Sequence, residues 1–159
     1  MGQLVHDIGR VQPQALSMEE AVLGAVMLDR EAFGIVCELL RPEHFYLDAH
    51  QHIFRACLDL SNSSSPIDLL TVTEKLNQNG KLAAIGGGYY LVELSNRVAS
   101  AANIEAHARI IAEMHIRREG IRVSTENLQR AYEHGADAFE TLDTAMAGLM
   151  GIMSPYQTA

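Results

Sequence analysis

The feature that most constrains the fold is a long helical pattern in the last third of the chain, over residues 103–134. This segment contains no proline and one internal glycine, Gly120, and its apolar residues recur at the period of an α-helix. His134-Gly135 predicts the end of the helix, because glycine adopts the left-handed conformation of helix ends without steric penalty. At ~1.5 Å per residue such a helix is roughly 45–50 Å long, so we expect part of it to project beyond its own domain.

A second helix follows, and its apolar residues are spaced by three and four positions. That spacing gives a narrow seam of the kind that packs against other helices, and two helices joined by a short turn form a helical hairpin. A projecting hairpin with an apolar seam needs a partner, and we expect this partner to be another copy of the chain. The predicted self-association residues are Met114, Ile121, Leu128, Phe139, Leu142, Met146 and Leu149.

Two interpretations stay open for these residues. Ile121 and Leu128 pack either within the hairpin or against a second copy. The late methionines Met114, Met146, Met150 and Met153 are either core residues or an adaptable contact surface, a role that the flexible thioether side chain suits.

The rest of the sequence predicts an all-α fold, a compact bundle of about six helices followed by the long projecting hairpin. Ser17 and Glu20 have the spacing of a capping box, and the apolar stretch 21–28 that follows predicts a central core helix. Asp48 is a candidate cap for a later helix, and Asp68 or Thr71 for the one after it. The expected organisation is a flexible arm over 1–14, a globular head over 15–99, the hairpin over 100–153 and the start of a linker over 154–159.

Composition narrows the function classes. The chain has 159 residues, a net charge of −8 and two cysteines, which indicate reduced core thiols rather than a disulfide framework. No apolar run approaches the roughly 18 residues of a membrane span, and the N-terminus does not resemble a signal peptide. The acidic balance weighs against a nucleic-acid-binding protein, yet six of the twelve basic residues lie between Arg97 and Arg130. Four of these six, the arginines at 117, 118, 122 and 130, lie in the predicted hairpin. The six form either a solvated helix face or a surface for an acidic partner.

No motif predicts an active site. His44, His50 and His52 cluster in sequence but lack the spacing of a zinc site. The glycines at 86–88 have no predicted strand before them and no Lys-Ser/Thr after them, so they predict a turn into a helix rather than a phosphate loop. We therefore expect the chain itself to be non-catalytic, with no cofactor and no metal.

Several segments, in order, resemble the N-terminal domain of the bacterial replicative DNA helicase family, DnaB. The first runs from Leu16 to Asp29, and the second from Leu40 to Tyr46. The remaining matches are Ala49-His50 with Ile53-Phe54, Pro66-Ile67-Asp68 with Thr71-Val72, Gly86-Gly87 with Tyr90-Leu91 and Leu94, and Ser100–Glu105 with Ala108-Arg109-Ile110.

The resemblance implies an all-helical head and a hairpin that pairs two subunits, with three pairs forming the collar of a hexameric ring. It implies primase as a partner, with Tyr90, Ile121 and Leu128 as candidate contacts, together with a helicase loader and a cytoplasmic role at the replication fork. The motor domain is not in this sequence, which has no Gly-x-x-x-x-Gly-Lys-Ser/Thr. ATP and Mg²⁺ are therefore expected only in the absent domain. A nucleic-acid-binding module and a free-standing helical adaptor are the alternatives.

Overall fold

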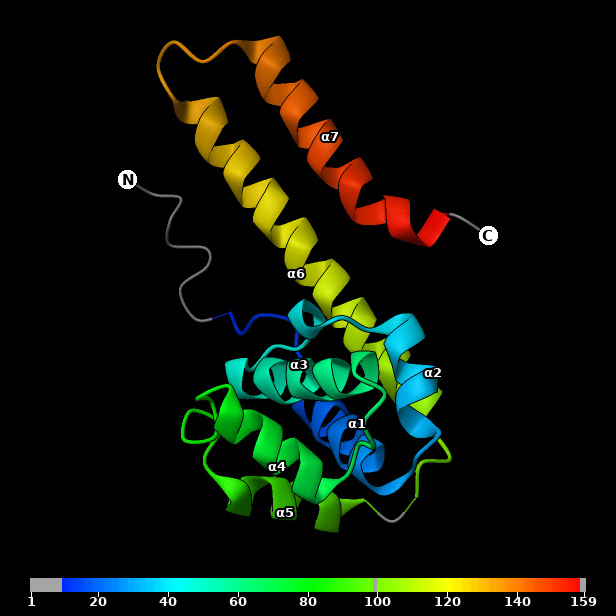
Figure 1. Cartoon of the computed structure of the whole chain (residues 1–159). Coiled ribbons are helices and arrows are strands. Elements are labelled where there is room, and N and C mark those ends of the chain that lie inside the picture. The colour runs from blue at the N-terminus through cyan, green and yellow to red at the C-terminus, as the bar shows by residue number, and fades with distance from the viewer. Residues whose placement is uncertain (1–9, 99, 158–159) are drawn as a thin grey trace. The chain divides into compact units, whose positions relative to one another are not determined.

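The structure is a computed structural model that describes residues 10–98 and 100–157. All regular elements of this part of the chain are helices, as the sequence predicts (Figure 1). They are α1 (Leu16–Leu28), α2 (Ala32–Leu39), the 3₁₀ helix η2 (Pro42–His44), α3 (Asp48–Asn62), α4 (Leu69–Gln78), α5 (Gly88–Arg97), α6 (Ile104–Tyr132) and α7 (Ala138–Gln157).

The chain forms two compact units. The head comprises Gln14–His115, and the hairpin unit comprises residues 116–157 together with residues 10–13. Helix α6 contributes to both units, because it begins in the head and its second half pairs with α7. The division therefore falls inside α6 at residue 116, whereas the sequence placed the start of the hairpin at residue 100.

Helix α1 is the central helix of the head, as its apolar sequence predicts. Val22, Leu23 and Val26 are fully buried, and α1 contacts α2, α3, α4 and α5 (Figure 1). The approach of α5 is especially close at Gly24, where an added Cβ would lie 2.3 Å from the carbonyl oxygen of Leu94. A side chain at position 24 would therefore push the two helices apart.

The start of α1 differs from the predicted capping box. The helix begins at Leu16, and its N-cap position, Ala15, makes no side-chain capping bond. Ser17 and Glu20 lie inside the helix, where Glu20 accepts a 2.6 Å hydrogen bond from Arg97. The capping interpretation is wrong, because the helix begins before Ser17 and the Glu20 carboxylate pairs with Arg97 instead of with the helix end.

Other predicted helix starts have mixed outcomes. Asp68 caps α4, since its carboxylate accepts a 2.9 Å hydrogen bond from the Thr71 amide and the Thr71 hydroxyl accepts one from the Asp68 amide. Asp48, by contrast, is the first residue of α3 and makes no capping bond.

Both cysteines are free, and burial raises the pKa of the Cys57 thiol to about 12, so this group stays protonated.

The first half of α6 belongs to the head core. Ile104, Ala108 and Ile111 recur at helical spacing and are all buried there. In the hairpin unit α6 ends at Tyr132, Gly135 has a φ of 85°, and the Asp137 carboxylate accepts a 2.8 Å hydrogen bond from the Glu140 amide in the first turn of α7. The predicted turn is confirmed.

The segment predicted as the start of a linker, from residue 154, is helical up to Gln157, because α7 continues through Pro155. Proline has no amide hydrogen, so the helix loses one backbone hydrogen bond in this last turn. The helix persists, and Ser154-Pro155 does not mark its end.

The contact at Gly24 leads to a stability prediction. Gly24→Ala is expected to lower the free energy of unfolding by about 1–3 kcal/mol, because the methyl group overpacks the α1–α5 contact. Chemical denaturation followed by circular dichroism measures the change. Gly34→Ala in α2 is the matched control, since nothing lies within 4 Å of its added Cβ, and it should be neutral or stabilising by up to about 1 kcal/mol. Equal effects of the two substitutions would contradict the overpacking argument.

Candidate functional site

Small side chains make the contact between the two helices of the hairpin unit. Val123 of α6 is buried, and an added Cβ on Gly148 of α7 would lie 3.0 Å from its Cγ1 atom. Asn127 and Ala145 line the same junction. The small residues of α7 allow a close approach, so little of its apolar surface is used inside the hairpin.

The predicted seam of α7 points away from α6. Phe139, Leu142 and Met146 are 80%, 56% and 60% exposed, and Leu149, Met150 and Met153 are also exposed. On α6, Leu128 is exposed and Ile121 is half-buried. The core interpretation of the late methionines is therefore wrong for Met146, Met150 and Met153, and packing within the hairpin is wrong for Leu128.

The exposed residues of the two helices lie on the same side of the hairpin. In α6, Ile121 and Leu128 are rotated by roughly 130° from the side that contacts α7, and in α7 the seam is rotated by roughly 110° in the same sense from the side that contacts α6. Because the helices are antiparallel, equal rotations about each axis bring both sets to one face. We call Ile121, Leu128, Phe139, Leu142, Met146, Leu149 and Met153 the apolar face.

The apolar face has a regular order along the hairpin. Leu128 and Leu142 each lie seven residues from Gly135, and Ile121 and Leu149 each lie fourteen residues from it. Residues at equal separation from the turn lie at about the same level of an antiparallel helix pair. The face therefore consists of leucine and isoleucine pairs, with Met146 between the two levels and Phe139 nearest the turn.

The opposite side of the hairpin is polar. Arg122 pairs with Glu119 at 2.8 Å and with Glu126 at 3.0 Å, and Arg130 and Thr144 line a shallow pocket beside them. Of the other predicted arginines, Arg118 donates a 2.7 Å hydrogen bond to the Pro13 carbonyl and Arg117 lines a pocket next to residues 10–13. A hairpin with one polar and one apolar side is typical of a module that covers its apolar side with a partner.

The head contains a buried polar network at the position of the other predicted contact, Tyr90. The Glu19 carboxylate accepts hydrogen bonds from the Tyr46 amide at 2.6 Å and from His50 Nδ1 at 2.5 Å. His50 Nε2 lies 2.6 Å from the Tyr90 hydroxyl, and the two rings are stacked. Burial, followed by the nearby charge of Glu20, raises the pKa of Tyr90. The hydroxyl of Tyr90 thus faces the interior, whereas the ring of the neighbouring Tyr89, which no sequence pattern distinguishes, is exposed.

The remaining motifs have local structural roles. His44 Nδ1 accepts a 3.0 Å hydrogen bond from the Arg41 amide, and within residues 10–98 and 100–157 no three potential ligands converge as a metal site would require. Gly86 and Gly87 have φ values of 102° and 79° and form the turn into α5. None of the helices described is both long and apolar enough to cross a membrane.

Comparison with known proteins identifies the family. A family model described as the DnaB-like helicase N-terminal domain matches residues 11–113. The chain belongs to the DnaB-like helicase N-terminal domain family. The match covers residues 11–13 and nearly all of the head, and it ends before residue 116, so the residues of the apolar face lie outside the matched range.

Relatives of this DnaB-like domain extend the similarity into the hairpin. The replicative DNA helicase DnaB of Rhodothermus marinus is 52% identical over 144 residues, which are 91% of this chain and 15% of that protein. The DnaB of Geobacillus stearothermophilus is 42% identical over 90% of this chain and 32% of its own length. The replicative DNA helicase DnaC of Bacillus subtilis is 36% identical over the whole chain and 35% of its own length. The chain thus spans about a third or less of these relatives.

Two solved structures share the DnaB-like fold. The N-terminal domain of DnaB helicase from Mycobacterium tuberculosis has a TM-score of 0.84 and 38% identity, and the match covers 89% of this chain and 99% of that one. A DnaB-like replicative helicase, described with its interactions with primase, has a TM-score of 0.71 and 25% identity over 88% of this chain and 31% of that one.

The buried network of the head predicts a specific cost. Tyr90→Phe is expected to lower the free energy of unfolding by about 1–3 kcal/mol, because it leaves buried His50 Nε2 without its partner. Thermal or chemical denaturation measures the loss. Tyr89→Phe removes the same hydroxyl from an exposed ring and should change stability by less than about 0.5 kcal/mol. A similar result for both variants would mean that the Tyr90 hydroxyl does not stabilise the head.

Proposed function

We propose that this chain is the collar module of a replicative DNA helicase, which assembles subunits through its hairpin and docks primase. The observation that carries the proposal is the apolar face, which the chain itself leaves exposed. The family and the length of the relatives support the rest: a motor domain follows this module in the parent protein, binds ATP and Mg²⁺, and unwinds DNA in the 5′-to-3′ direction.

Within this proposal, two copies cover each other's apolar faces, and three such dimers form the ring of the full protein. A pairing of this kind is isologous, so each residue of the face is used twice in one dimer. The parent acts in the cytoplasm, where a loader places the ring on DNA. Arg122 weighs against the alternative of a nucleic-acid-binding module, because its guanidinium is already paired with two carboxylates of its own helix.

Self-association is the first test. The wild-type chain is expected to form dimers in sedimentation equilibrium, and Leu142→Asp is expected to raise the dissociation constant by roughly a hundredfold or more, because pairing would bury an unpaired carboxylate. Leu142 is exposed in the single chain, so the substitution leaves the hairpin itself intact. Ile121→Asp should act in the same direction.

The matched control is Leu70→Asp, which places the same charge on an exposed leucine of the head. This variant should associate like the wild type. A wild-type chain that stays monomeric at high micromolar concentration would overturn the proposal, and unchanged association of Leu142→Asp would remove the apolar face from the interface.

Primase docking is the second test. The related DnaB-like helicase described with primase supports a docking role, and Ile121, Leu128 and Tyr90 are the candidate contacts. Titration calorimetry with primase is expected to show binding by the wild type and by Leu70→Asp. Leu128→Asp should lose most of this binding, because its carboxylate disrupts an apolar contact. Binding equal to the wild type would place the primase site elsewhere on the chain.

A further inference from the structure

Three methionines form a stripe on the exposed side of α7. Met146, Met150 and Met153 are spaced by four and three residues, so their side chains lie on one side of the helix. They are 60%, 66% and 53% exposed, and Met146 and Met153 belong to the apolar face. We call these three residues the methionine stripe, which is open to small solutes in the single chain.

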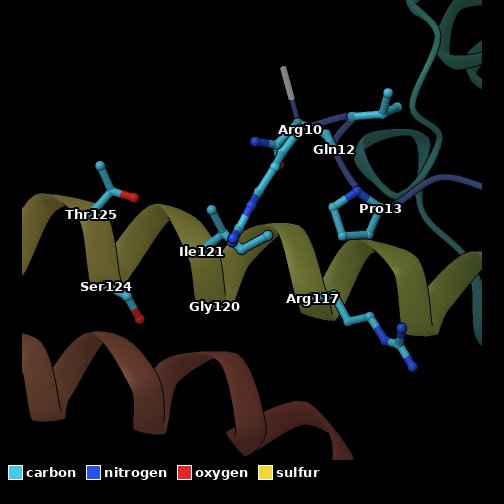
Figure 2. A pocket seen from close by; sticks show the side chains of 9 residues that line it. Arg10, Gln12, Pro13, Arg117, Gly120, Ile121, Ser124 and Thr125 are labelled. Carbon is cyan, nitrogen blue, oxygen red and sulfur yellow. The ribbon is translucent and has the colours of Figure 1, made fainter. Parts of the chain in front are cut away.

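The other helix contributes no sulfur to the apolar face. On α6 the face consists of Ile121 and Leu128. A pocket of about 590 Å³ lies beside Ile121, between residues 10–13 and α6, and none of the residues that line it carries sulfur. Figure 2 shows the Arg10 side chain reaching towards Ile121, with Pro13 beside the helix. A reagent that is selective for sulfur therefore changes the apolar face at the methionine stripe.

The other sulfur atoms in the described part of the chain are less exposed. Met27 is 4% exposed, Met18 packs against the head core, and Met114 is half-buried. Cys57 is buried and Cys37 is half-buried. A thioether has no proton to lose, so access of the oxidant to the sulfur decides which methionines react first. The chain thus has reactive methionines on the apolar face and protected ones in the head.

We propose that the methionine stripe is a modification site for two-electron, oxygen-donating oxidants such as hydrogen peroxide, and that its oxidation prevents self-association. In this reaction a bond forms between the sulfur and one peroxide oxygen while the peroxide oxygen–oxygen bond breaks. The sulfur loses two electrons and becomes a sulfoxide, and the second oxygen leaves as water with both peroxide protons. This inference rests on the proposed function, because it describes how pairing of the apolar faces is regulated.

Oxidation opposes pairing because it makes an apolar surface polar. The sulfoxide oxygen accepts hydrogen bonds, and its burial without a donor is unfavourable. The neighbouring side chains of the face, Phe139, Leu142 and Leu149, have no donor to offer. An isologous pairing uses each modified residue twice, which doubles the effect. Sulfoxide reductases reverse the modification, so the stripe can return to its pairing state.

Treatment of the purified chain with hydrogen peroxide tests the proposal. Peptide mass spectrometry should find sulfoxide in the methionine stripe before it appears at Met18 or Met27. Dithiothreitol is then added to reverse cysteine oxidation. Sedimentation equilibrium should give a dissociation constant at least about tenfold above that of the untreated chain. Methionine sulfoxide reductases A and B should restore the original constant.

A variant without the three sulfurs is the decisive comparison. Met146→Leu, Met150→Leu and Met153→Leu together keep the face apolar and nearly conserve its volume. This triple variant should pair like the wild type, and peroxide should leave its dissociation constant unchanged. The matched control combines Met18→Leu with Met114→Leu and should stay as sensitive to peroxide as the wild type. Circular dichroism confirms that every substituted or oxidised chain is folded.

Three results would overturn the proposal. They are normal pairing of a wild-type chain whose stripe is fully converted to sulfoxide, an equal loss of pairing in the peroxide-treated triple variant, and pairing that the reductases do not restore. The last two would assign the loss to damage elsewhere in the chain. All three leave the proposed function standing, whereas an untreated wild-type chain that stays monomeric removes the function itself.

Discussion

The close approach of α6 and α7 through small side chains determines which apolar residues of the hairpin unit stay exposed. Because Gly148 allows contact with Val123, the two helices pack with few large residues between them. The leucines, methionines and phenylalanine of α7 are then directed to one side, where none of the described residues buries them. A hairpin held together by its large residues would leave no such face. The capacity to associate therefore follows from which residues the hairpin uses to hold itself together.

Much of the fold could be predicted from the sequence, because its strongest signals are local. The hairpin turn at Gly135, the buried line of Ile104 and Ala108, and the central helix α1 each depend on spacing within one segment. The direction of the α7 seam could not be predicted in the same way. A spacing of three and four residues indicates that a helix face is covered, but it does not say by which helix.

A second signal was present in α7 and could have settled the direction of its seam. Thr141, Ala145, Gly148 and Ile152 are also spaced by four and three residues, and these are the half-buried positions of α7. Small residues at helical spacing permit close helix contact, so this stripe identifies the side that faces α6. The buried role of Glu19 gave no such local signal, because its partner His50 lies 31 residues away in the sequence.

The exposed face cannot serve two partners at once on the same copy. Ile121 and Leu128 are candidates for both self-association and primase docking, yet a residue covered by a second hairpin is closed to a third protein. If two copies pair through the apolar face, primase must contact what pairing leaves open, such as the ring of Tyr89 or the polar side with Arg122. If primase instead contacts Leu128 directly, it competes with pairing, and its affinity falls as the chain concentration rises. The concentration dependence of primase binding therefore separates a collar that docks primase after assembly from one that must open to admit it.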